Sequence, residues 1–250
     1  MRIIRSIIMA VSTFTKIPMP RQDWDRANMK YTLAALPFVG VLTGIFIYIW
    51  ALAADALGFG AILFSAGLTL IPVILTGGIH LDGFCDTMDA INSRAAPERK
   101  REILKDPRIG AFAAIWLGVY LTAYFALCSE FTPDVTVAFK LGATAVISRA
   151  AAGIAIAALP RSSEGGLADT LRGDSREATL FVCILWLIWA GVFAWGAAVA
   201  SIICILWVRR MSKRDFGGMS GDLAGYLISI CELFGIMTVI INDKAGLTWF

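Results

Sequence analysis

Six apolar runs divide the chain, and most of them have the length of a membrane-spanning helix. They cover residues 31–54, 61–79, 109–128, 136–159, 178–208 and 220–241. At about 1.5 Å per residue, roughly 20 residues cross a hydrocarbon core of about 30 Å. The pattern therefore predicts an all-α, polytopic integral membrane protein that forms a single domain over residues 1–250. The first fifteen residues, with Arg2 and Arg5 among isoleucines, are a candidate interfacial helix.

The run 178–208 is too long for one crossing. As a single helix its 31 residues would measure about 46 Å, which requires a strong tilt. Basic residues follow it at 209–214 and also gather in three earlier segments, namely 1–30, 80–108 and 160–177. Because basic loops stay in the cytoplasm, both ends of the run are expected there. We therefore predict a hairpin that turns near Gly191–Gly196, seven membrane segments and an outer C-terminus; a single span would give six.

Composition supports a membrane protein without a sizeable soluble domain. The chain is 58% hydrophobic and 16% charged, whereas a soluble domain carries about 25% charged residues. The net charge is only +3, so the positions of the charges matter more than their total. We expect the lipid bilayer as a partner and no nucleic acid. The N-terminus lacks a small-residue cleavage site, so we expect no signal peptide. The five cysteines are scattered without a CxxC pair, which predicts buried free thiols.

Residues 78–89, GIHLDGFCDTMD, place three carboxylates at the end of the second apolar run. If that helix continues past the membrane surface, Asp82, Asp86 and Asp89 fall at positions i, i+4 and i+7, within about 60° on one face. Carboxylates stacked in this way repel one another unless a cation neutralises them, and their oxygens suit Mg²⁺ or Mn²⁺. The alternative is a solvated acidic helix end that pairs with the arginines after it.

A basic loop follows the three acids. Six basic residues lie within twenty positions: Arg94, Arg99, Lys100, Arg101, Lys105 and Arg108. Metal-binding carboxylates beside arginines are suited to a diphosphate, although the loop also carries charge that sets the topology. We select Asn92, Arg94, Lys105, Asp106 and Arg108 as candidate substrate or phosphate ligands. The stretch from Lys105 to Gly110 predicts a turn, in which glycine permits a close approach.

His80 is the only histidine, two residues before Asp82. It is a candidate metal ligand, a base or a hydrogen-bond donor to a nearby acid, and we prefer the base because Mg²⁺ prefers oxygen.

Three charged residues, Lys140, Arg149 and Glu232, lie inside apolar runs. Ionisable groups within a bilayer face protein or water and are candidate functional residues. We interpret Lys140 as structural. Arg149, about 16 Å deep, is a candidate anion clamp in a polar cavity. Glu232 is a candidate partner of Asp222, ten residues before it, or a second residue of the cavity that Arg149 lines.

A glycine-rich segment, DFGGMSGD, opens the last apolar run. Gly217, Gly218 and Gly221 would expose backbone N–H groups beside Asp222, at a helix N-terminus where a phosphate can dock. Glycine-rich helix starts also occur as plain hinges, so this motif is weak by itself.

The chain resembles the cobalamin synthase family, the adenosylcobinamide-GDP ribazoletransferases. The resemblance rests on motifs that occur in order along nearly the whole chain: FTKIPMP (14–20), GGIHLDGFCDTMDA (77–90), ERKREILKDPRIGAF (98–112), SRAA (148–151) and GGMSGD (217–222) with Glu232. Phe84, Cys85 and Ser220 depart from the family pattern without removing a charged group.

The resemblance implies a polytopic inner-membrane enzyme that requires Mg²⁺ and acts at the cytoplasmic face. It would join α-ribazole or its 5′-phosphate to adenosylcobinamide-GDP and release GMP. His80, Asp82 and Asp86 would then be catalytic, and Asp82, Asp86 and Asp89 would hold the metal. Two alternatives stay open: a CDP-alcohol phosphotransferase-like phospholipid enzyme and a membrane transporter. Gly- and Ala-rich faces would also permit a homo-oligomer.

Overall fold

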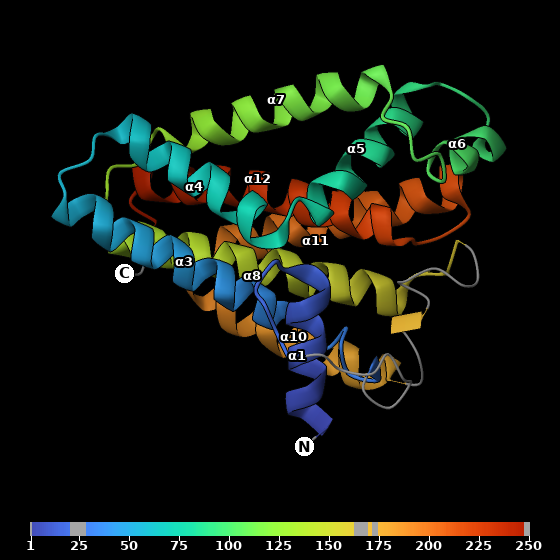
Figure 1. Cartoon of the computed structure of the whole chain (residues 1–250), viewed down its shortest axis with the longest axis horizontal. Coiled ribbons are helices and arrows are strands. Elements are labelled where there is room, and N and C mark those ends of the chain that lie inside the picture. The colour runs from blue at the N-terminus through green and yellow to red at the C-terminus, as the bar shows by residue number, and fades with distance from the viewer. Residues whose placement is uncertain (1, 21–28, 163–169, 172–174, 248–250) are drawn as a thin grey trace.

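The computed structural model of the chain is a bundle of helices joined by short connections (Figure 1). It describes residues 2–20, 29–162, 170–171 and 175–247. Within these ranges the regular elements are helices, apart from one isolated β-bridge between Arg161 and Met219, so the all-α prediction is confirmed. The helices are α1 (Arg2–Phe14), α3 (Leu36–Ala56), α4 (Ala61–Thr76), α5 (Ile79–Asn92), α6 (Pro97–Ile103), α7 (Ala111–Cys128), α8 (Val135–Ala158), α10 (Arg176–Phe193), α11 (Trp195–Met211), η1 (Ser212–Phe216) and α12 (Gly221–Lys244).

Helix α8 lies inside the bundle, where α3, α10, α11 and α12 all pack against it. Its side chains are buried along almost its whole length. A Cβ atom on Gly142 would lie 2.9 Å from the Cα of Gly44 on α3, so glycine permits this close helix approach. The small residues that suggested a homo-oligomer therefore pack within the chain itself.

In the part of the chain that the structure describes, six helical stretches are long and apolar enough to cross a membrane, and the bent pair of α4 and α5 adds a seventh. These numbers agree with the six to seven segments expected from the sequence. The long run 178–208 consists of two helices, α10 and α11, which separate at Ala194. A Cβ atom on Gly191 would lie 3.1 Å from that of Ala198, so the chain folds back at the turn. The predicted hairpin is confirmed.

The second apolar run and the acids after it do not form one straight helix. Helix α4 ends at Thr76, α5 begins at Ile79, and the two helices are bent by 94°. Gly77 and Gly78 between them have φ values of 63° and 81°, a region that favours glycine. The backbone N–H of Lys16 donates to the carbonyl of Leu75 (2.7 Å), and the Lys16 side chain covers Gly77. The expectation that the second helix continues past the membrane surface is therefore wrong, because the chain turns sharply before the acids.

The two ends of the helix bundle differ in the elements and the charged side chains that lie there. At one end, which we call the α6 end, lie α6, η1, the start of α12 and the connection at 160–162 (Figure 1). The far end carries the ion pair between Lys140 and Asp243 (2.7 Å) and that between Lys244 and Glu130. Lys140 is thus structural, as predicted. Helix α1 lies crosswise to the long helices, the orientation expected of a helix at a membrane surface (Figure 1).

Candidate active site

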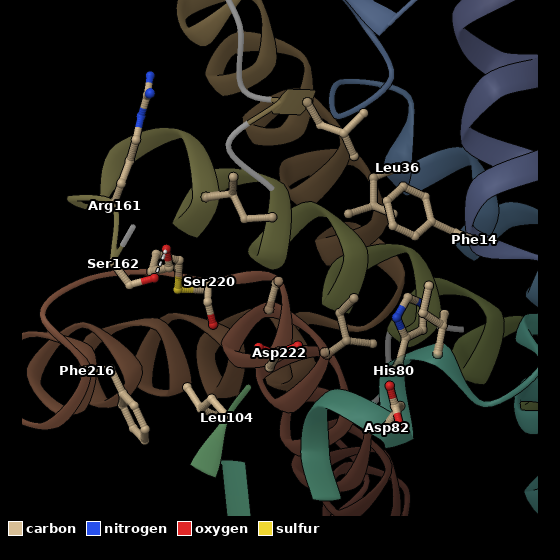
Figure 2. A pocket seen from close by; sticks show the side chains of 18 of the residues that line it. Phe14, Leu36, His80, Asp82, Leu104, Arg161, Ser162, Phe216, Ser220 and Asp222 are labelled. Atoms are coloured by element: carbon tan, nitrogen blue, oxygen red, sulfur yellow. Dashed lines mark hydrogen bonds between the residues drawn. The ribbon is translucent and has the colours of Figure 1, made fainter. Parts of the chain in front are cut away.

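A cavity of about 480 Å³ opens at the α6 end (Figure 2). Its polar lining includes His80 and Asp82 from the start of α5, Asp222 and Ser220 from the start of α12, and Lys105 after α6. Apolar side chains complete the wall, among them Phe14, Leu36, Leu104, Phe216 and Ile228. We call this space the main cavity. It combines carboxylates, a histidine and cations with a largely apolar surround, as ligand sites commonly do.

Helix α5 presents its carboxylates on one accessible stripe. The structure is α-helical without interruption from Ile79 to Asn92, so Asp82, Asp86 and Asp89 share a face, as predicted. All three are at least partly exposed, whereas the residues between them at 83–85, 87 and 88 are buried. Packing against α7 and α12 covers the rest of the helix and leaves the acidic stripe open.

Asp222 brings a fourth carboxylate to the same place from the other end of the sequence. Its carboxylate interacts repulsively with Asp82, and Asp86 is repelled by Asp82, Asp222 and Asp89. None of the four forms an ion pair with any residue that the structure describes. Repulsion between like charges gathered in this way is relieved when one carboxylate is protonated or when a cation binds.

The donor chemistry of this group fits a hard divalent cation. In the described ranges no three acidic, histidine or cysteine side chains converge closely enough to enclose an ion. Mg²⁺ is usually held by only one or two carboxylates and completes its shell with water and substrate phosphates. The donor set would therefore suit an ion that one or two of these carboxylates hold and that a phosphate-containing substrate shares.

Two glycines bring α5 and α12 into backbone contact. A Cβ atom on Gly83 would lie 2.7 Å from the carbonyl oxygen of Asp222, and one on Gly225 would lie 2.8 Å from that of His80. Only residues without a side chain allow the helices to cross so closely. Neither glycine was predicted as part of the site. The signal was the glycine that directly follows Asp82 in LDGF.

The turn after α6 supports the third acid of the stripe. A Cβ atom on Gly110 would lie 2.0 Å from an oxygen of the Asp89 carboxylate, so this glycine permits the close approach that the sequence predicted. Arg108 donates side-chain and backbone hydrogen bonds to the Asp106 carboxylate (2.7–3.1 Å). These bonds lower the pKa of Asp106 to about 2 and close the predicted turn.

The predicted phosphate ligands divide into two groups. Lys105 lines the main cavity, and Arg101, which we had not selected, joins it there. Asn92, Arg94, Asp106 and Arg108 do not line it: the amide of Asn92 donates to the carbonyl of Met88 (2.7 Å), and Arg108 pairs with Asp106. The basic loop is held against η1, between α11 and α12, by a buried ion pair between Lys100 and Asp215 (2.9 Å).

The glycine-rich segment is hydrogen-bonded through its backbone to the 160–162 connection. Met219 donates to the carbonyl of Pro160 (2.7 Å), and Ser162 donates to that of Met219 (3.1 Å). A Cβ atom on Gly218 would lie 2.3 Å from the Arg161 backbone, and the Gly218 N–H already donates to Ser212. Gly217 and Gly218 thus shape the turn, and Gly221 is the glycine of this segment that lines the main cavity with Asp222.

Arg149 and Glu232 lie deeper, beneath the main cavity. They form an ion pair with each other, and Arg149 also donates to Ser148 (3.0 Å). Only 1% of the Arg149 surface is exposed. Neither residue lines the main cavity, so the structure brings Arg149 to Glu232 and not to the space where a substrate phosphate would lie. All five cysteines are buried free thiols, as predicted.

Comparison with known proteins identifies the family. The model of the cobalamin-5-phosphate synthase family matches residues 6–240. The chain belongs to the cobalamin-5-phosphate synthase family. Curated relatives align with this chain over most of their own length and most of this chain. The adenosylcobinamide-GDP ribazoletransferase of Lachnoclostridium phytofermentans is 34% identical over 97% of this chain and 96% of its own. That of Pseudomonas savastanoi is 32% identical over 88% and 90%, respectively.

The remaining comparisons agree with this placement in the cobalamin-5-phosphate synthase family. The adenosylcobinamide-GDP ribazoletransferase of Clostridium perfringens strain SM101 is 29% identical over 93% of this chain and 96% of its own. No solved structure matches the chain. The resemblance drawn from the sequence motifs is thus confirmed at the level of the family, and the motifs that carried it lie mainly around the main cavity.

Proposed function

We propose that this protein transfers the adenosylcobinamide-phosphate group of adenosylcobinamide-GDP to α-ribazole or its 5′-phosphate. A ribose hydroxyl of the acceptor attacks the phosphorus on the cobinamide side, the bond to the bridging oxygen breaks, and GMP leaves with the electron pair. The observation that carries this proposal is the family match over residues 6–240, since the curated relatives are named for this transfer. The main cavity supports it with groups suited to a diphosphate.

The candidate carboxylates for holding Mg²⁺ are Asp82 and Asp222, which line the main cavity, and Asp86 and Asp89, which lie outside its lining on the same stripe of α5. When bound, the ion would neutralise the charge that develops on the diphosphate oxygens. Lys105 and Arg101 line the cavity and would bind phosphate oxygens on the other side. His80, in the same wall as Asp82, is suited to accept the proton of the attacking hydroxyl as general base.

The apolar part of the wall suits the bulk of a corrinoid. Phe14 and Leu36 lie on one side of the main cavity, and Leu104 and Phe216 lie on the opposite side (Figure 2). A bulky substrate could rest against this surface while its diphosphate reaches the acids. We also propose that the α6 end faces the cytoplasm in the cell's inner membrane, since Lys and Arg are concentrated in its loops.

The test is product formation by the purified full chain in detergent or lipid nanodiscs. Adenosylcobinamide-GDP, α-ribazole 5′-phosphate and Mg²⁺ should yield GMP and the joined corrinoid in equal amounts, and omitting the acceptor should prevent both. A folded preparation that releases no GMP under these conditions would refute the proposal. Incorporation of a labelled CDP-alcohol instead would favour the phospholipid enzyme, and binding of either substrate without any product would favour a transporter.

A further inference from the structure

A second, smaller cavity lies beneath the main cavity, between five helices. It measures about 20 Å³ and is lined by residues of α4, α5, α7, α8 and α12. The polar residues around it include His80, Tyr120, Arg149, Ser229 and Glu232. His80 belongs to both cavities, so its ring forms part of the partition between them. We call this space the lower cavity.

Two buried nitrogen atoms at the lower cavity have no hydrogen-bond partner among the residues that the structure describes. They are Nε2 of His80, a residue that is 8% exposed, and Nε of Arg149, which is 1% exposed. Arg149 uses its Nη1 atom for Glu232, Ser148 and the carbonyl of Ala145, which leaves Nε unsatisfied. Buried polar atoms almost always have a partner, either in the protein or in an ordered water molecule.

The size and lining of the lower cavity match one water molecule. A space of about 20 Å³ exceeds the roughly 10–15 Å³ that a buried water needs, and such a water requires two to four polar partners. His80, Arg149, Glu232 and Tyr120 offer that number. A purely apolar cavity of this size would stay dry, but this one contains a guanidinium, a carboxylate and an imidazole.

We infer that one buried water joins His80 to the Arg149–Glu232 pair, and that this pair positions the imidazole instead of binding a substrate phosphate. The water accepts hydrogen bonds from Arg149 Nε and His80 Nε2 and donates one to Glu232. With Nε2 held in this way, Nδ1 is the nitrogen left to serve the main cavity. Phe14, whose ring stacks on His80 with centroids 6.3 Å apart, restrains the ring from another side.

The kinetic part of this inference rests on the proposed function, whereas the water site does not. Arg149 and Glu232 act on the reaction only through His80, so they are positioning residues. Their loss should lower kcat and leave KM for the GDP-activated substrate unchanged. A direct phosphate clamp would instead raise KM when removed.

The test uses the fact that His80 is the only histidine of the chain. Full-length protein labelled with ¹⁵N-histidine, purified through a histidine-free tag and placed in nanodiscs, gives a single imidazole in NMR spectra. We expect a neutral ring protonated at Nε2, with a cross-peak between its proton and water. In Arg149→Gln this cross-peak should disappear, and kcat should fall about tenfold or more.

Two further variants keep the test decisive. Val73→Ile adds one methyl group to the wall of the lower cavity, so it should displace the water and reproduce both effects without removing a charge. Lys140→Gln breaks a different ion pair between α8 and α12, at the far end, and should change neither the NMR signals nor kcat.

Three results would overturn the inference. They are a wild-type ring without the water cross-peak, unchanged kcat in a folded Val73→Ile protein, and a rise in KM alone in Arg149→Gln. If the wild-type protein released no GMP, the proposed function would fail, but the NMR measurement would still test the water site. The two hypotheses can therefore fail separately.

Discussion

Replacing Gly83 with alanine tests whether the crossing of α5 and α12 sets the geometry of the carboxylates. The added carbon would lie 2.7 Å from the carbonyl oxygen and 2.8 Å from the Cα of Asp222. Both are backbone atoms, so no side-chain rotation relieves the overlap. The helices must separate by about 1 Å before the carbon reaches an ordinary contact distance of about 3.5 Å.

This displacement acts directly on the proposed catalytic groups. Asp82 precedes Gly83 on α5, and the overlapping atoms belong to Asp222 on α12, so the separation moves two carboxylates apart. A misplacement of about 1 Å costs roughly a hundredfold in rate, and overpacking a core costs about 1–3 kcal/mol of stability. We expect Gly83→Ala to fold, to lose a few degrees of thermal stability and to lose about a hundredfold in GMP release.

The matched control is Gly118→Ala on α7, where an added carbon has no neighbour within 4 Å. This variant should keep wild-type activity, and alanine should slightly stabilise its helix. The assay is the rate of GMP release per folded protein, with folding followed by size-exclusion chromatography and circular dichroism. If Gly83→Ala were folded and as active as Gly118→Ala, the close crossing would not determine the position of the acids.

Three further predictions address the metal, the basic loop and the topology. Asp82→Asn should abolish GMP release in a protein that still inserts into membranes, and a chelator should do the same to the wild type; near-full activity in either case would contradict the metal role. Asp215→Asn should lower the free energy of unfolding by about 3 kcal/mol, because it leaves Lys100 buried without its carboxylate. Thermal unfolding in detergent measures this change, and an unaltered transition would show that the ion pair does not stabilise the fold. Lys213→Cys should react with a membrane-impermeant thiol reagent only from the cytoplasmic side, since the native cysteines are buried; labelling from outside would reverse the proposed orientation.

The number of helices could be predicted because a bilayer imposes a length on each apolar run. The hairpin at Ala194 is the clearest example, since 31 apolar residues exceed one crossing and basic residues follow the run. Lys140 could be interpreted as structural because it lies near a helix end, where Asp243 of α12 meets it. These conclusions depend on the length of each apolar run and on the charged residues next to it, and both can be read directly from the sequence.

Contacts between distant segments could not be predicted in the same way. Spacing on α5 indicated that three acids share a face, but it contained no information on which helix lies opposite. Asp222 reaches that face only because Gly83 and Gly225 allow α5 and α12 to touch, and the two helices are far apart in the sequence. Arg149 was assigned to a phosphate for the same reason, since its depth in the membrane was predictable but its pairing with Glu232 was not.

The bend between α4 and α5 explains why the acids reach α12. A straight continuation of α4 would carry Asp82 and Asp86 onward along the axis of that helix. The 94° bend instead lays α5 across the start of α12, where the main cavity opens. Left-handed backbone costs most residues about 1–2 kcal/mol, and Gly77 and Gly78 adopt it without that cost. The GG pair directly before the acidic motif is therefore as much a part of the site as the acids, because it sets the direction in which they point.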